Sequence, residues 1–150
     1  MNSEDLNFKI SITGTFHQKV PVYSILLNDQ LIKHDVLTVN SGEIETIEFT
    51  SVVTDGANSL KIRLENKESS DTIVDNDVII KDMVIDITDI KIDEIPIGSL
   101  LWNAEYLLDE PHDYHGQTVT RLENCVTLGW NGTYVLNFTS PFYIWLLENL

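Results

Sequence analysis

Residues 82–97 read DMVIDITDIKIDEIPI, and this stretch carries the clearest structural pattern in the 150-residue chain. Apolar residues alternate with polar ones at positions 83, 85 and 87, resume out of phase at 90 and 92, and shift again at 95 and 97. Because successive side chains of a strand point to opposite faces, one extra residue reverses this phase. We predict one long strand with β-bulges near Thr88-Asp89 and Asp93-Glu94. Its isoleucine content and two-residue spacing favour a strand over a helix.

Shorter alternating segments precede this strand at intervals of roughly ten to twelve residues, which is typical of all-β proteins. They lie at residues 8–12, 23–27, 45–53 and 60–64. No convincing amphipathic helix interrupts them before residue 97. The sequence therefore predicts a single domain, residues 1–150, with an antiparallel, jelly-roll-like β-sandwich. Its apolar C-terminus predicts a short final strand or helix.

Turn-forming residues predict two hairpins and one long loop. Asn28-Asp29-Gln30 separates two apolar runs and predicts a three-residue hairpin loop. Asn131-Gly132 lies between strand-like residues 126–130 and 133–138, and it predicts a type I′ turn because both residue types accept positive φ. Residues 109–117 contain Pro111 and Gly116 and predict the longest irregular loop, whereas 100–102 predict a short strand.

The charge of the chain limits its partners. Nine Lys and Arg against 24 Asp and Glu give a net charge of −15. Phosphate backbones and anionic lipids repel such a protein, so we expect no direct nucleic-acid partner. The same acidity is compatible with solubility alone or with Ca²⁺, which prefers carboxylate and carbonyl oxygens.

Cysteine usage and the N-terminus bear on the compartment. Cys125 is the only cysteine, which excludes an intrachain disulfide and indicates a buried, unreactive thiol. No apolar run of signal-peptide length follows the acidic N-terminus, and no segment approaches the roughly 18 apolar residues of a membrane span. We expect a protein without a signal peptide or membrane span, made in a host cytoplasm and assembled there into a virion.

Two acidic or histidine-containing segments are candidate metal sites. Asp71, Asp75 and Asp77 lie close together in sequence and offer oxygen ligands to Ca²⁺, although their spacing differs from that of an EF-hand. The alternative is an ordinary hydrated acidic loop. His112 and His115 lie among carboxylates and offer a Zn²⁺-type site, but four ligands are not evident, so a solvated loop is the competing interpretation.

The sequence carries no motif that predicts catalysis. A Gly-x-Ser-x-Gly turn, a cysteine in a catalytic context and a phosphate-binding glycine loop are all missing from the sequence. Paired carboxylates for glycoside hydrolysis depend on spatial separation, which the sequence does not give. We predict that the protein is not an enzyme.

The turn around Asn131 is the candidate glycan contact. Trp130 and Tyr134 flank it, and sugar rings stack on exposed aromatic faces while amides such as that of Asn131 bond hydroxyl groups. Trp130, Asn131 and Tyr134 are therefore the predicted glycan-binding residues. The competing interpretation is cross-strand aromatic packing within a hairpin.

The C-terminal segment is almost wholly apolar. Phe142, Tyr143, Trp145 and Leu146 would form a hydrophobic patch if they were exposed, and such patches mark partner surfaces. We predict either that this segment closes the core of its own domain or that these residues form an interface with a neighbouring subunit.

Strand patterning is shared with a known family in three segments. They read LNDQL at residues 27–31, LKIRLEN at 60–66 and VIDITDIKIDEI at 84–95. Together they resemble the small calcium-dependent, xylan-binding type of carbohydrate-binding module. The resemblance, about residues 20–97, implies a jelly-roll β-sandwich of a kind that is appended to enzymes and is also similar to domains of bacteriophage tails and virions. Glu94 stands where that family often turns on Gly, and from Leu100 onward no ligand positions carry over.

The composition and the resemblance lead to two functional predictions. The acidic, Asn- and Ile-rich chain looks like a bacteriophage structural protein, so we predict a non-catalytic structural or adsorption component of a bacteriophage-like virion. It would act through contacts with other copies of itself or with other virion proteins. The alternative is a calcium-dependent carbohydrate-binding module that uses the acidic loop and the Trp130 turn to bind glycans.

Overall fold

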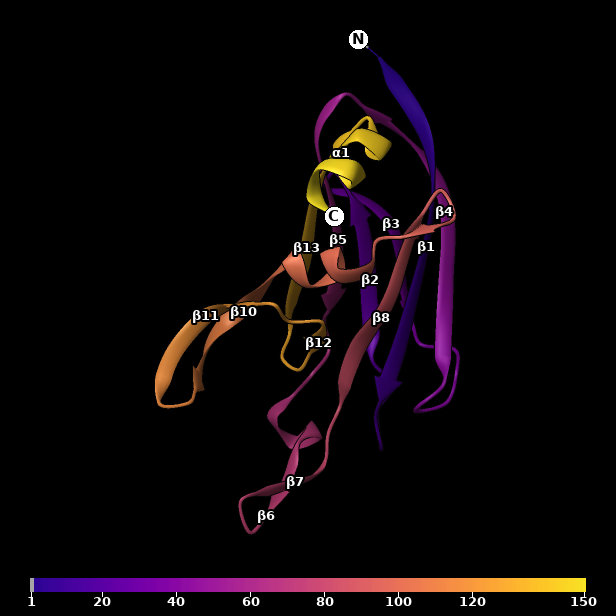
Figure 1. Cartoon of the computed structure of the whole chain (residues 1–150). Coiled ribbons are helices and arrows are strands. Elements are labelled where there is room, and N and C mark those ends of the chain that lie inside the picture. Colours follow the sequence, from indigo (N-terminus) through magenta and orange to yellow (C-terminus); the bar gives the residue numbers. More distant parts are fainter. Residues whose placement is uncertain (1) are drawn as a thin grey trace.

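The structure is a computed structural model that describes residues 2–150, and two antiparallel sheets dominate it (Figure 1). One sheet contains β1 (Ser3–Thr15), β4 (Ile44–Thr54), β8 (Val84–Ile92), β9 (Ile95–Pro96) and β12 (Thr127–Leu128). The other contains β2 (Val22–Leu27), β3 (Gln30–Val36), β5 (Gly56–Leu64), β10 (Glu105–Tyr114), β11 (Gln117–Glu123) and β13 (Gly132–Ser140). The predicted antiparallel β-sandwich is confirmed.

The strand orders show how the chain moves between the sheets. The first sheet has the order β12-β8-β1-β4, with β9 beside β8, and the second has the order β11-β10-β13-β5-β2-β3. A separate hairpin of β6 (Ile73–Asp75) and β7 (Val78–Lys81) belongs to neither sheet. The remaining elements are the 3₁₀ helices η1 (Ser69–Asp71) and η2 (Gly98–Asn103) and the helix α1 (Phe142–Asn149).

The core lies between the two sheets and follows from the two-residue alternation of the strands. From Leu6 to Ile12 every second side chain of β1 points inward and is fully buried. Alternate side chains are also buried in β5 from Asn58 to Leu64, and in β8 on either side of Thr88. Each such aliphatic or aromatic side chain contributes roughly 1.5–3 kcal/mol through burial. The largest fully buried side chains are Tyr23, Tyr106, Tyr134, Phe8, Phe138 and Phe142.

The stretch of residues 82–97 forms a shorter strand than we predicted. Ser11 pairs with Asp89 and Ile12 with Ile87, so Thr88 is the extra residue of a β-bulge, as expected. The second predicted bulge is wrong. Asp93 and Glu94 adopt positive φ values of 52° and 69° and form a tight turn, after which β9 folds back on β8.

The predicted hairpin around Asn131-Gly132 is also wrong. β12 pairs with β8 in one sheet, whereas β13 pairs with β5 and β10 in the other, so the connection crosses the sandwich. Gly132 serves close packing, because a Cβ there would lie 2.4 Å from the Leu107 carbonyl oxygen. The dipeptide Asn131-Gly132, which favours a hairpin turn, therefore lies in a connection between the two sheets, where packing against a residue distant in sequence requires the glycine.

Three further segments differ from the predictions. The turn between β2 and β3 has two residues, Asn28-Asp29, with the extra residue placed as a bulge in β3. Residues 109–117 are not a loop, because β10 and β11 form a hairpin through His115-Gly116. Pro111 lies where the β10–β11 pairing is interrupted, so its missing N–H breaks no ladder bond. Residues 100–102 lie in η2.

Two hairpins extend beyond the sandwich. The β6–β7 hairpin projects from the end opposite α1, and the β10–β11 hairpin projects to one side (Figure 1). Within residues 2–150, no helix is long and apolar enough to cross a membrane.

Candidate functional site

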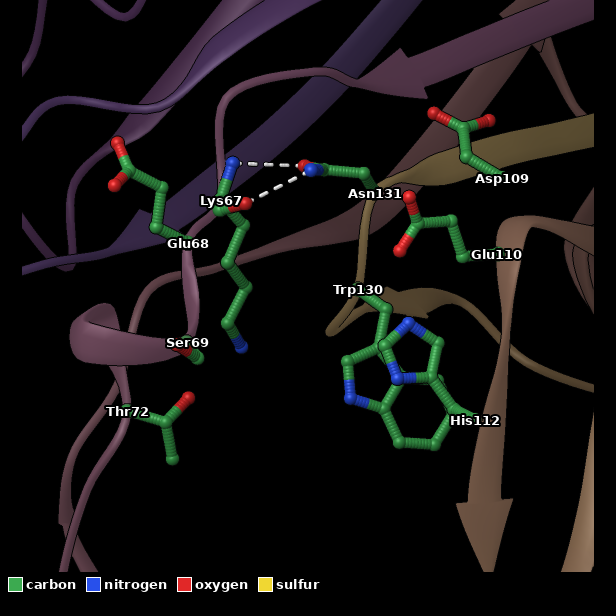
Figure 2. A pocket seen from close by; sticks show the side chains of 9 residues that line it. All are labelled: Lys67, Glu68, Ser69, Thr72, Asp109, Glu110, His112, Trp130 and Asn131. Carbon is green, nitrogen blue, oxygen red and sulfur yellow. Dashed lines mark hydrogen bonds between the residues drawn. The ribbon is translucent and has the colours of Figure 1, made fainter.

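A cleft of about 670 Å³ lies where three separate segments meet. Its walls come from the loop that contains η1, from the outer half of β10, and from the crossover between β12 and β13 (Figure 2). Its volume falls within the range of about 300–1,000 Å³ that is usual for ligand sites. The lining residues are Lys67, Glu68, Ser69, Thr72, Asp109, Glu110, His112, Trp130 and Asn131.

Two stacked rings form the aromatic wall of this cleft. The His112 and Trp130 rings are nearly parallel, with an interplanar angle of 6° and centroids 4.3 Å apart (Figure 2). Tyr114 meets Trp130 edge-on, with centroids 6.2 Å apart and an interplanar angle of 90°. His112 and Trp130 are both half-buried, so the pair is packed on the protein and still presents surface to the cleft.

Trp130 is held in place by its neighbours. The Asn131 side-chain amide accepts a hydrogen bond from the Lys67 backbone N–H at 2.7 Å and donates to the Lys67 carbonyl at 2.8 Å (Figure 2). The Lys67 ammonium donates to the Gly129 carbonyl, and the Tyr106 hydroxyl donates to the Trp130 carbonyl. Three consecutive residues of the crossover are therefore fixed, which preorganises the aromatic wall.

Asp82 anchors the opposite wall. Its carboxylate accepts hydrogen bonds from the Lys67 ammonium at 2.7 Å, the Thr72 hydroxyl at 2.6 Å and the Met83 backbone N–H at 2.8 Å. Burial alone would raise the pKa of Asp82, but these three donors outweigh burial and hold the pKa below its usual range. The carboxylate thus ties both ends of the η1 loop to the start of β8.

The polar side chains that remain around the cleft differ in how they are engaged. Glu68 lies 3.1 Å from the Lys19 ammonium, and Asp109 lies 2.9 Å from the Arg63 guanidinium. Glu110 is exposed and, within residues 2–150, has no ion-pair partner. Such side chains offer hydrogen-bond acceptors to a ligand that lies against the aromatic wall.

The predicted glycan-binding residues have different surroundings. Trp130 and Asn131 line the cleft, although the Asn131 amide is occupied by Lys67. Tyr134 is fully buried and its hydroxyl donates to the Leu101 carbonyl at 2.6 Å, so its ring does not reach a surface ligand. Burial raises the pKa of Tyr134. His112, considered above only as a metal ligand, emerges instead as half of the aromatic wall.

The three predicted calcium ligands do not gather. Asp71 is buried, and its carboxylate lies 2.9 Å from the Lys19 ammonium and accepts the Glu68 backbone N–H at 2.7 Å. Asp75 and Asp77 are exposed on the β6–β7 hairpin, where Asp77 lies in the turn with φ of 63°. Among residues 2–150, no group of three or more His, Cys, Asp or Glu side chains is arranged to hold a metal ion. These residues do not fit Ca²⁺, and His112 and His115 form no such group either.

The C-terminal segment divides between core and surface. Phe142 and Leu146 are buried against the sandwich, and Trp145 is half-buried beside Phe138 with ring centroids 6.2 Å apart. Tyr143 is 49% exposed. Packing into the protein's own core thus accounts for one face of α1. Its other face exposes Tyr143, Ile144 and Leu147, and Leu150, which follows the helix, is exposed as well.

Comparison with known proteins supports the fold. The sequence matches no protein-family model and no curated protein. The structure is similar to vCBM60 in complex with galactobiose, with a TM-score of 0.54 and 11% identity over 87% of this chain and 98% of that one. It is also similar to a selenomethionine form of vCBM60, with a TM-score of 0.53 and 11% identity over 87% of this chain and 89% of that one.

The description of the second structure refers to two families of calcium-dependent carbohydrate-binding modules linked by circular permutation. At this level of identity the likeness shows a fold of the carbohydrate-binding-module type. It agrees with the resemblance of residues 27–31, 60–66 and 84–95 to such modules.

Proposed function

We propose that this chain is a non-catalytic carbohydrate-binding module whose ligand occupies the cleft. The observation that carries this proposal is the His112–Trp130 stack, which is fixed at the wall of a concavity of ligand size. The fold, which is similar to that of carbohydrate-binding modules, supports it. The carbohydrate-binding alternative therefore becomes the main interpretation.

The chemistry of the cleft suits a sugar ring. The C–H face of a pyranose is apolar and packs on aromatic surface, while its hydroxyl groups need donors and acceptors around its rim. The His112–Trp130 pair would supply the aromatic surface, and Ser69 and Glu110 would supply hydrogen-bond donors and acceptors. Because Lys67 and Asn131 fix the crossover before any ligand arrives, little ordering of Trp130 accompanies binding.

Calcium has no step in this proposal. Calcium dependence is stated for the two module families that are named with the selenomethionine structure, and it is a property of those modules. In this chain the predicted aspartate ligands are dispersed or engaged elsewhere, so we derive binding from the aromatic wall and the polar rim alone.

The predicted virion role draws no support from the fold or from the comparisons. It remains a prediction, as does self-association through the exposed face of α1. The exposed residues of α1 are not among those that line the cleft, so self-association through α1 is compatible with glycan binding.

A glycan array followed by titration calorimetry tests the proposal. Trp130→Ala should abolish measurable binding of whichever oligosaccharide binds the wild-type protein. Trp102→Ala is the matched control, because Trp102 is 48% exposed in η2 and does not line the cleft. Loss of binding in both variants, or in neither, would contradict the proposed site.

A further inference from the structure

Within the part of the chain that the structure describes, the cleft lacks a cation that is free to meet a ligand. Among residues 2–150, Lys67 is the only basic residue other than His112 that lines it, and the Lys67 side chain is 8% exposed. The Lys67 ammonium lies 2.7 Å from the Asp82 carboxylate and also donates to the Gly129 carbonyl. Its charge is therefore neutralised behind the wall.

Acidic groups face the same space. Glu68, Asp109 and Glu110 all line the cleft. Lys19 and Arg63 lie beside the first two, but Glu110 has no such partner within residues 2–150. Figure 2 shows the Glu110 side chain extending from β10 toward the wall that carries Asn131 and Lys67. One uncompensated carboxylate thus points into the cleft.

The aromatic wall favours a cation by a separate mechanism. A cation near the face of an aromatic ring is attracted by the ring quadrupole, most strongly when the ring is that of Trp. The His112–Trp130 pair borders the same cleft as Glu110. Two independent features, a carboxylate and an aromatic surface, therefore point to one ligand group.

We propose that the cleft selects glycans that carry free amino groups, such as oligomers of glucosamine, and that Glu110 is the residue that determines this selectivity. The sugar ammonium pairs with the Glu110 carboxylate while the ring lies against His112–Trp130. Glycans that carry carboxylates are disfavoured, because they meet like charge. This inference rests on the proposed function and adds the class of ligand to it.

Three tetrasaccharides distinguish the possibilities: β-1,4-linked glucosamine, its N-acetylated form, and an oligogalacturonate. Acetylation keeps the sugar ring and removes the positive charge of the amino group. Calorimetry is done at low salt and at one pH, at which the amino groups are protonated. It should show the glucosamine oligomer binding roughly three- to tenfold more tightly than the acetylated one, as expected for a partly exposed ion pair beside an aromatic face. The galacturonate should bind most weakly, and added salt should reduce these differences.

Glu110→Gln should remove the preference for the amine, because it weakens binding of the glucosamine oligomer more than binding of the acetylated one. Glu148→Gln is the control, because it makes the same change in net charge on the exposed end of α1. Equal affinities for the charged and acetylated oligomers, with Trp130 still required, would overturn this inference and leave the proposed function standing. A failure of every array glycan and all three oligomers to bind would overturn both.

Discussion

The side-chain amide of Asn131 pairs with both backbone groups of Lys67, through an N–H···O contact of 2.7 Å and a second of 2.8 Å. These residues are 64 positions apart in sequence and lie in two different walls of the cleft. The pairing joins the η1 loop to the crossover between the sheets. It explains how the half-buried Trp130 can be held rigidly on a segment that has few ladder bonds of its own.

Asn131→Ala should therefore weaken both the fold and ligand binding. It leaves the backbone N–H and carbonyl of Lys67 without partners, which costs about 1–3 kcal/mol of unfolding free energy. Asn137→Ala is a suitable control, because Asn137 is exposed on β13. Urea unfolding measures the loss of stability. Equal stability of the two variants would contradict the role of the pairing.

Gly132→Ala tests the close packing of the crossover on β10. A Cβ at position 132 would lie 2.4 Å from the Leu107 carbonyl oxygen, so the backbone must shift, at a cost of about 1–3 kcal/mol. Gly129→Ala is the matched control, because the nearest atom to a Cβ there is Val84 Cγ1 at 4.0 Å. Thermal melts should separate the two variants, and indistinguishable melting temperatures would count against the packing described.

Acid unfolding tests the network around Asp82. The pKa of Asp82 is depressed in the folded state, so its stabilisation is present above the unfolded-state value of about 3.9 and is lost as pH falls through the lower folded-state value. Asp82→Asn should lower the free energy of unfolding at neutral pH and flatten its decline below pH ~4. Asp75→Asn, at an exposed position, is the control. A decline as steep as that of the wild type would argue against this network.

Removal of calcium should leave the protein unchanged. Because no set of three acidic or histidine ligands gathers among residues 2–150, we expect the same melting temperature in millimolar CaCl₂ and in EDTA. A ligand that binds only the native state raises the apparent stability, so a higher melting temperature in CaCl₂ would reveal a site built from other oxygen atoms.

The two faces of α1 should respond differently to substitution. Phe142 is fully buried, so Phe142→Ala should cost about 3–5 kcal/mol of unfolding free energy. Leu147 is 77% exposed, and Leu147→Ala should change stability by less than about 0.5 kcal/mol. If the exposed face mediates self-association, Tyr143→Ser together with Leu147→Ser should reduce the mass that light scattering reports. An unchanged monomeric mass for the wild type and the variant would exclude that interface.

Much of the sandwich could be predicted from local sequence, because burial of alternate residues leaves a direct pattern. β1, β5 and β8 are examples, and the bulge at Thr88 follows from the phase change between Ile87 and Ile90. The turn at Asp93-Glu94 produces the same change of phase as a bulge would. Only the pairing of β9 with β8 shows that Asp93-Glu94 form a turn and not a bulge.

The candidate site was harder to predict, because its residues gain their roles from distant partners. Asn131-Gly132 has the sequence of a turn, yet the Asn131 amide is occupied by Lys67 and Gly132 lies against Leu107. His112 and Trp130 stack although they come from β10 and the crossover. No local pattern marks Lys67 as the residue that fixes the segment around Trp130.

Nuclear magnetic resonance of the three tryptophan indole N–H groups tests the central claim most directly. Trp130 lines the cleft, Trp102 lies in η2, and Trp145, in α1, packs beside Phe138. Titration with the oligosaccharide that binds most tightly should shift the Trp130 indole signal progressively to saturation and leave the other two in place. Saturable shifts confined to Trp102 or Trp145, with Trp130 unmoved, would place the ligand elsewhere and contradict the assignment of the cleft as the glycan-binding site.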